Sequence, residues 1–265
     1  MCEYYYHYTS LASLALIIKT KSILLNSLDK MDDVEDGKTN DFNHARKYVF
    51  CSSWTTQKDD LNFWSMYGAN MHGVCIGLCK DPFEYFEWKN DHYSDNKIII
   101  PRDNYYLPED KALGEKYTVA VPFKGMFFTK VEYSDKREEL YPDIVNWKND
   151  TSSLEVNFGK VGLFKHKAWR NQQEWRYRVV CFPTSYENML TSDSEGGGVY
   201  NDMQKGIELP IPYIHLTISE KALNTMQIIK GPKMSDGEQL LLESFLKQYC
   251  PDIKVSPSEL HMRCK

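Results

Sequence analysis

Four short groups of polar and aromatic residues are the parts of this sequence whose side chains could do chemistry. Histidine, glutamate and lysine can transfer protons or hold charge, while tyrosine and tryptophan can stack on flat ligands. Arg176 follows Glu174 by two residues, the spacing that places side chains on one face of a strand and permits an ion pair. The four groups are Tyr6-His7-Tyr8-Thr9, residues 62–73 (NFWSMYGANMHG), Lys165 with Trp169, and Gln172-x-Glu174-Trp175-Arg176.

Helices and strands that alternate irregularly must position these groups. Strands are predicted from aromatic and β-branched runs, and helices from apolar residues at helical spacing. This irregular order favours one α+β domain over residues 1–265, with a twisted mixed or antiparallel central sheet flanked by helices. The predicted strands are 4–8, 23–25, 48–54, 74–79, 98–100, 118–122, 127–133, 176–182, 214–218, 226–229 and 253–255, and the predicted helices are 11–20, 61–71, two within 138–160, and 236–249.

Two polar segments are predicted to be loops. Residues 31–37 (MDDVEDG) resemble the opening of a calcium loop, but Val34 occupies a ligand position and Asn43 replaces the closing glutamate, which indicates a solvated turn. Residues 184–203 include three consecutive glycines and predict a mobile surface loop that could act as a lid.

Composition excludes several classes of protein. The net charge of −5, without a basic stripe, disfavours binding of duplex DNA. The first residues resemble no secretion signal, and no run approaches the roughly 20 apolar residues of a membrane span, so we expect a cytoplasmic protein without membrane contact. The seven cysteines are scattered and lack zinc-site spacing, so we expect reduced thiols and no metal.

The middle motifs resemble a bacterial family catalogued as domain of unknown function 2971. Residues 63–68 (FWSMYG) and 72–77 (HGVCIG) match its central block, and the lysine, tryptophan and Gln-x-Glu-Trp-Arg ending follows later. The resemblance extends over nearly the whole chain. It departs from the family pattern in the acidic turn, which lacks a proline, and at Gln172, where the pattern has a glutamate.

A second resemblance is to ADP-ribosyltransferase-like folds, and it is a fold-level analogy. His-Tyr-Thr on a first strand, Ser52 on a later strand and Gln-x-Glu near a third follow the order of elements in such folds. The resemblance implies an enzyme that uses NAD as its substrate. Such an enzyme would transfer ADP-ribose to a protein or nucleic-acid acceptor, or to water, as a bacterial toxin or phage-defence effector.

Each residue then has an expected role. Cleavage of the N-glycosidic bond passes through an oxocarbenium-like state that a fixed carboxylate can stabilise, and Glu174 is the candidate. Gln172 would orient the acceptor, and His7 would hydrogen-bond the ribose or the amide. We expect Glu174→Gln to lower turnover by ~100-fold with little change in fold stability. The expected ligand-binding residues are Tyr6, Tyr8, Thr9, Ser52, Trp64, Tyr67, His72, Lys165 and Arg176.

Three alternatives stay open at this point. The chain could be a non-catalytic module that holds a small nucleotide-like ligand in an aromatic pocket, or a structural interaction domain in which Lys165, Glu174 and Arg176 form a salt-bridge network. A magnesium-dependent nuclease would use Asp32, Glu35, Glu174 and Lys165, but the acidic net charge disfavours it. The NAD-using enzyme is distinguished from these alternatives by whether the four groups of residues meet in space.

Overall fold

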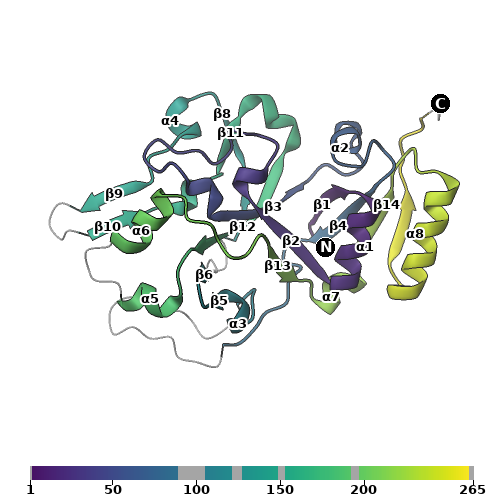
Figure 1. The fold of residues 1–265 in the computed structure, drawn as a ribbon. Coiled ribbons are helices and arrows are strands. Elements are labelled where there is room, and N and C mark those ends of the chain that lie inside the picture. The colour runs from purple at the N-terminus through teal and green to yellow at the C-terminus, as the bar shows by residue number, and fades with distance from the viewer. Residues whose placement is uncertain (1, 89–104, 121–126, 149–152, 192–196, 263–265) are drawn as a thin grey trace.

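The computed structural model describes residues 2–88, 105–120, 127–148, 153–191 and 197–262, and eleven strands in these ranges form one sheet (Figure 1). Neighbouring strands are antiparallel except β14 and β15, which are parallel, so the predicted α+β fold with a mixed central sheet is confirmed. The main path is β15 (Lys254–Pro257), β14 (Gln227–Lys230), β4 (Val74–Cys79), β1 (Tyr4–Thr9), β3 (Val49–Thr55), β12 (Glu174–Phe182), β6 (Tyr117–Ala120) and β5 (Leu113–Gly114). Beside it, β2 (Ser22–Ser27) pairs with β3 and β13 (Ile214–Thr217), and β7 (Phe128–Lys130) pairs with β12.

Two helices with clear sequence signals pack at the β14 end of the sheet. Helix α1 (Leu11–Thr20) begins after Ser10, whose side chain accepts a hydrogen bond from the Ser13 backbone, and it buries Leu14 and Ile18. Helix α8 (Asp236–Tyr249) begins with a capping box and contacts α1, as Figure 1 shows. No helix in the described ranges is long and apolar enough to cross a membrane.

Helix α2 (Leu61–Met66) carries the middle motif and is held close to β1. The Asp60 carboxylate caps it by accepting hydrogen bonds from the backbone N–H groups of Asn62 and Phe63. The chain then returns to β4 through a tight turn, in which a Cβ on Gly73 would lie 2.2 Å from the carbonyl oxygen of Thr9. Only glycine permits this close approach, which fixes the end of the motif against the first strand.

The segment 138–160 contradicts the prediction of two short helices. It contains α4 (Arg137–Leu140) followed by a hairpin of β9 (Val145–Lys148) and β10 (Ser153–Val156). The Asp41 carboxylate accepts hydrogen bonds from the backbone N–H groups of Ile144 and Val145, from a position about a hundred residues away. This long-range contact holds an extended chain where the apolar spacing alone favours a helix.

Other predicted elements differ in detail. The described part of 184–203 contains two helices, α5 (Tyr186–Thr191) and α6 (Gly197–Gln204), and its mobility stays a prediction. The predicted strand 98–100 lies outside the described residues, and strand 127–133 is divided into β7 and β8 (Glu132–Ser134). The remaining described elements are β11 (Phe164–His166), α3 (Glu109–Ala112), α7 (Glu220–Asn224), and the 3-10 helices η1 (Leu28–Lys30), η2 (Ala45–Lys47), η3 (Phe158–Lys160) and η4 (Lys167–Gln172).

Cys2 and Cys79 form a disulfide, with their Cα atoms 6.0 Å apart. In the antiparallel pair of β1 and β4, Tyr4 lies opposite Cys79, so the chain start reaches this cysteine. The prediction of reduced thiols is therefore wrong for these two residues, because strand pairing rather than sequence spacing brought them together. The free cysteines of the described ranges are Cys51, Cys75, Cys181 and Cys250.

Candidate functional site

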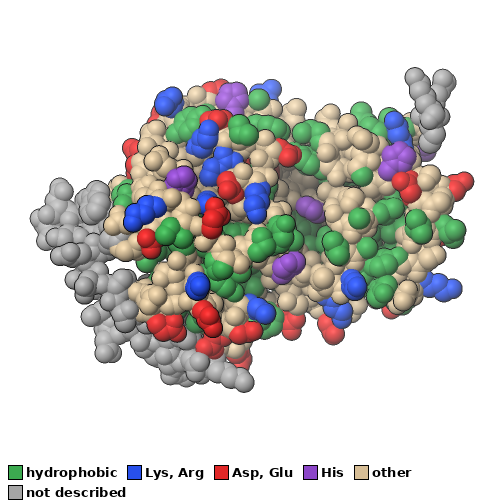
Figure 2. Space-filling view, viewed as in Figure 1, with side chains coloured by type: hydrophobic (Ala, Val, Ile, Leu, Met, Phe, Trp, Pro, Cys, Tyr) green, Lys and Arg blue, Asp and Glu red, His purple; other side chains and the backbone are tan. Residues whose placement is uncertain are grey.

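A cavity of about 460 Å³ opens between β1, α1, β2, β3 and the start of β12. Its volume is in the range of pockets that hold cofactors and other small organic ligands. The space-filling view shows a hollow near the middle of one face of the molecule, with a histidine side chain visible inside it (Figure 2). This cavity is the candidate site.

Most of the residues predicted for the site line this one cavity, although they come from distant parts of the chain. The structure therefore brings together three of the four sequence groups, and two residues of the group at 62–73, Phe63 and Tyr67, join them. The predicted residues that line the cavity are Tyr6, His7, Tyr8, Thr9, Ser52, Tyr67, Lys165, Gln172, Glu174 and Arg176.

Four buried charged side chains, Asp36, Lys165, Glu174 and Arg176, form the floor of the cavity, and we call them the charged cluster. Lys165 Nζ lies 3.0 Å from one Glu174 oxygen, and Arg176 Nε lies 2.6 Å from the other. Arg176 also donates to both oxygens of Asp36, with Nη1 2.9 Å from Oδ1. Two cations thus match two carboxylates away from water, as buried charges require.

The Glu174 carboxyl is strongly held in its ionised form. Burial by itself would raise its pKa, but the positive charges of Arg176 and Lys165 outweigh burial and lower the pKa to about 2. The backbone N–H of Glu174 donates to the Tyr133 hydroxyl at 2.9 Å, which helps to place the residue. Glu174 is therefore a fixed hydrogen-bond acceptor whose charge is offset by two neighbours.

Asp36 reaches the cluster because the acidic turn packs inward. Asp36 and Gly37 are buried, so the prediction of a solvated turn is wrong at these two residues. Gly37 has a φ of +74°, and a Cβ there would lie 2.9 Å from a methyl group of Leu28. The turn presses against the core at this point because the Arg176 guanidinium offers Asp36 a paired position inside it.

Gln172 connects the charged cluster to Tyr67. Its amide oxygen accepts from Lys165 Nζ at 2.9 Å, and its amide nitrogen donates to the Tyr67 hydroxyl at 2.7 Å. Burial raises the pKa of Tyr67 to about 12, with a further contribution from the charge of Asp32. Tyr67 is therefore protonated at neutral pH and can donate its own hydrogen to a ligand.

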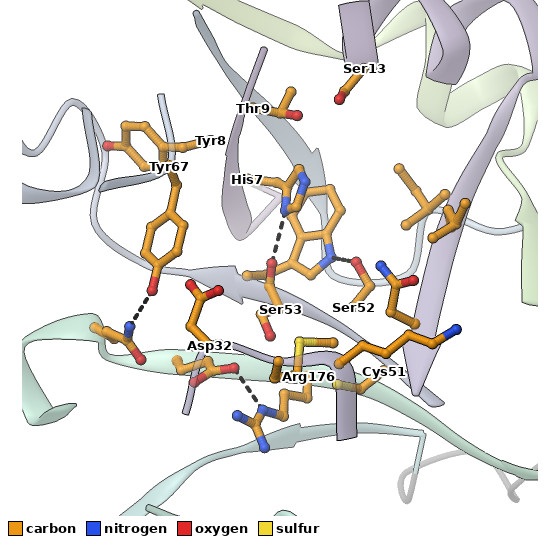
Figure 3. Close-up of a pocket in the computed structure, with 18 of the residues that line it drawn as sticks. His7, Tyr8, Thr9, Ser13, Asp32, Cys51, Ser52, Ser53, Tyr67 and Arg176 are labelled. Atoms are coloured by element: carbon orange, nitrogen blue, oxygen red, sulfur yellow. Dashed lines mark hydrogen bonds and ion pairs between the residues drawn. The ribbon is translucent and has the colours of Figure 1, made fainter. Parts of the chain in front are cut away.

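His7 presents an unprotonated nitrogen to the cavity. Its Nδ1 lies 2.9 Å from the Ser53 carbonyl oxygen, which can only accept, so Nδ1 carries the hydrogen (Figure 3). Burial lowers the pKa of the ring, although the bond to Ser53 opposes the change. The neutral ring then has Nε2 as an acceptor for a hydroxyl or amide group.

Trp64 and His72, both expected at the site, do not line the cavity. Trp64 is fully buried, packs edge-on against Tyr8 and donates from Nε1 to Asp59 at 2.6 Å. His72 lies on the surface, with Nδ1 3.0 Å from Glu238 of α8. Helix α2 ends at Met66 rather than at residue 71 as predicted, so Tyr67 lies at its C-cap, outside the helix.

Several cavity residues were not predicted from sequence. Trp169 was noticed beside Lys165, and the Lys165 ammonium lies 4.8 Å from its ring centroid. Asp36 carried only the weak signal of an acidic turn, and Asp32 was named only for the magnesium alternative. Glu35, which the magnesium alternative needs, bonds Lys38 and Tyr141 outside the cavity. Within the described ranges, no three His, Cys, Asp or Glu side chains are grouped to hold a metal ion.

Comparison with known proteins supports only the family resemblance. No curated protein and no solved structure matches the chain. The analogy to ADP-ribosyltransferases stays a prediction. Residues 63–177 match the family described as "Protein of unknown function (DUF2971)", and this range includes most of α2, Tyr67 and the part of β12 that holds Glu174 and Arg176.

Proposed function

We propose that the chain binds NAD in the 460 Å³ cavity and cleaves its N-glycosidic bond, transferring ADP-ribose to an acceptor or to water. One observation carries the proposal: His7, Tyr67 and Glu174, which come from three distant segments, line a single cavity of suitable size. A toxin or phage-defence role, with a protein or nucleic-acid acceptor, is part of the same proposal.

The side chains suit the ribose and the pyridine ring at the bond to be cleaved. Each Glu174 oxygen bonds one cation and keeps a further lone pair, so it can also accept a ribose hydroxyl. His7 Nε2 offers a second acceptor, and the rings of Tyr67 and Trp169 can stack on the pyridine. Bond cleavage leaves positive charge on the ribose, which a cavity with preorganised carboxylates can stabilise.

Gln172 acts differently in this arrangement from the role that the sequence suggested. Both ends of its amide already bond, one to Lys165 and one to Tyr67. In the proposal Gln172 holds the Tyr67 hydroxyl in place, and any effect on the acceptor passes through Tyr67.

A non-catalytic binding module is the second candidate, and one observation favours it. The charge of Glu174 is matched by Lys165 and Arg176, which suits the rigid floor of a binding pocket as well as it suits catalysis. The two candidates share the ligand class and differ in whether the N-glycosidic bond breaks.

One experiment separates them. The purified chain is incubated with NAD, binding is measured by calorimetry, and released nicotinamide is measured by chromatography. The enzyme proposal expects release that falls by ~100-fold in Glu174→Gln, the scale of one lost preorganised contact. Tyr249→Phe, at an exposed position of α8 and away from the cavity, is the control and should keep wild-type release.

The outcomes are distinct. Binding without nicotinamide release overturns the enzyme and supports the binding module, while the absence of both overturns both candidates. Thermal melting of each variant must accompany the assay, because Glu174→Gln leaves Lys165 and Arg176 without part of their compensation. The expectation that this substitution hardly changes stability therefore no longer holds.

A further inference from the structure

The cavity has more negative than positive side chains. Four carboxylates and three cations line it, which leaves one negative charge in excess when the histidines are neutral. The carboxylates are Asp32, Asp33, Asp36 and Glu174, and the cations are Lys30, Lys165 and Arg176. Which carboxylate carries the excess follows from the contacts.

Three of the four carboxylates already have partners. Asp36 and Glu174 are paired with the cations of the charged cluster. Asp33 accepts the backbone N–H of Glu35 at 3.0 Å and so holds its own turn. Lys30 lies over the Tyr213 ring, 5.3 Å from its centroid, and bonds no carboxylate in the described ranges.

Asp32 is the remaining carboxylate. It makes no hydrogen bond or ion pair with any other residue that the structure describes, and it lines the cavity. Figure 3 shows it between Tyr67 and Arg176. Its negative charge contributes, after burial, to the raised pKa of Tyr67, which agrees with a position close to that phenol.

We infer that Asp32 is the anionic group by which the cavity selects a ligand with a positively charged aromatic ring, such as an N-alkylated pyridinium. The charge attracts the ring, and the Tyr67 ring, which also lines the cavity, favours a cation over a neutral ring of the same shape. The inference deepens the proposed function and rests on it for the choice of ligand: it names the charge state of the ligand.

Asp32, rather than Glu174, then stabilises the positive charge that develops on the ribose during bond cleavage. When the bond between the ribose carbon and the pyridinium nitrogen breaks, the electron pair goes to the nitrogen and the positive charge passes to the ribose. The charge of Glu174 is already offset by two cations, whereas the charge of Asp32 has no cation bonded to it among the described residues and is free to stabilise this positive charge. Glu174 then holds a ribose hydroxyl while Asp32 faces the charge.

The test needs no turnover. Binding of the N-methylnicotinamide cation and of neutral nicotinamide to the full chain is measured by ligand-observed NMR titration at low salt. Wild type should prefer the cation, and Asp32→Asn should weaken cation binding by about fivefold, the scale of one partly exposed ion pair, without changing nicotinamide binding. Glu35→Gln, a turn carboxylate outside the cavity, should change neither affinity.

Three results would overturn the inference. They are no binding of the cation, no preference for the cation in wild type, or an equal loss of affinity for both ligands in Asp32→Asn. Failure of the proposed function looks different. If NAD stays intact after incubation but the preference for the cation disappears in Asp32→Asn, the proposed cleavage reaction is wrong and the role of Asp32 in binding is supported.

Discussion

Two pairs of a side-chain nitrogen and a carboxylate in this molecule have the same separation and very different surroundings. Lys165 Nζ lies 3.0 Å from Glu174 Oε2, and His72 Nδ1 lies 3.0 Å from Glu238 Oε2. The first pair is 7% and 6% exposed, whereas the second is 44% and 32% exposed. Water and salt screen the exposed pair, so distance alone does not say how much a pair contributes.

The difference also separates two regions of the molecule. The buried pair belongs to a cluster in which each charge depends on its neighbours, and it places the carboxylate on the cavity floor. The exposed pair joins the turn after α2 to the start of α8, where Glu238 already takes part in the capping box. One region therefore determines the geometry of the site, and the other joins two surface segments.

The largest effect is expected for Arg176→Met. The substitution leaves Asp36 and Glu174 with Lys165 as their only cation in the cluster, so one buried carboxylate loses its pair. The free energy of unfolding should fall by about 3–5 kcal/mol, measured by urea denaturation.

Arg178→Met is the matched control, two residues along the same strand. Arg178 is also buried, but it bonds the backbone carbonyls of Val161 and Gly159 rather than a carboxylate, and burial lowers its pKa to about 10. Its replacement should cost clearly less. Arg176 also donates to the Gly162 backbone carbonyl, at 2.9 Å, so equal losses in the two variants would show that its ion pairs add nothing to this backbone contact.

An intermediate effect is expected on acidification. The pKa of Glu174 in the folded protein is about 2, below its usual value of 4.5. Its ionised form therefore stabilises the fold fully at pH values above about 4.5. This contribution, on the order of 3 kcal/mol, should be lost as the pH falls from about 4.5 towards 2. Denaturation at a series of pH values should show the loss, and the decline should be smaller in Glu174→Gln. An identical decline in both proteins would assign it to other carboxylates.

The smallest effect is expected for His72→Gln. Because the pair with Glu238 is largely exposed, its loss should lower the free energy of unfolding by less than about 1 kcal/mol. Added salt should reduce even this difference. A loss as large as that of Arg176→Met would contradict the comparison and make the contact between the turn after α2 and the start of α8 a main support of the fold.

Sequence patterns predicted the elements whose signals are local. The apolar spacing of 236–249 and the residues around Ser235 agree with α8, and the run of β-branched and aromatic residues agrees with β12. The separation of Glu174 and Arg176 by two residues also correctly predicted their ion pair. These features depend on neighbours within a few residues, so the order of the side chains is enough to reveal them.

The amino-acid order by itself thus determined the elements with strong local signals, such as β12 and α8, the family resemblance and the residue types at the site. Only the tertiary structure decided that Asp36 pairs with Arg176, that Trp64 belongs to the core while Tyr67 faces the cavity, and that Asp32 has no partner among the described residues. Asp36 and Arg176 are 140 positions apart. A contact over that distance depends on strand pairing and on which charges are buried together, and neither leaves a periodic pattern in the sequence.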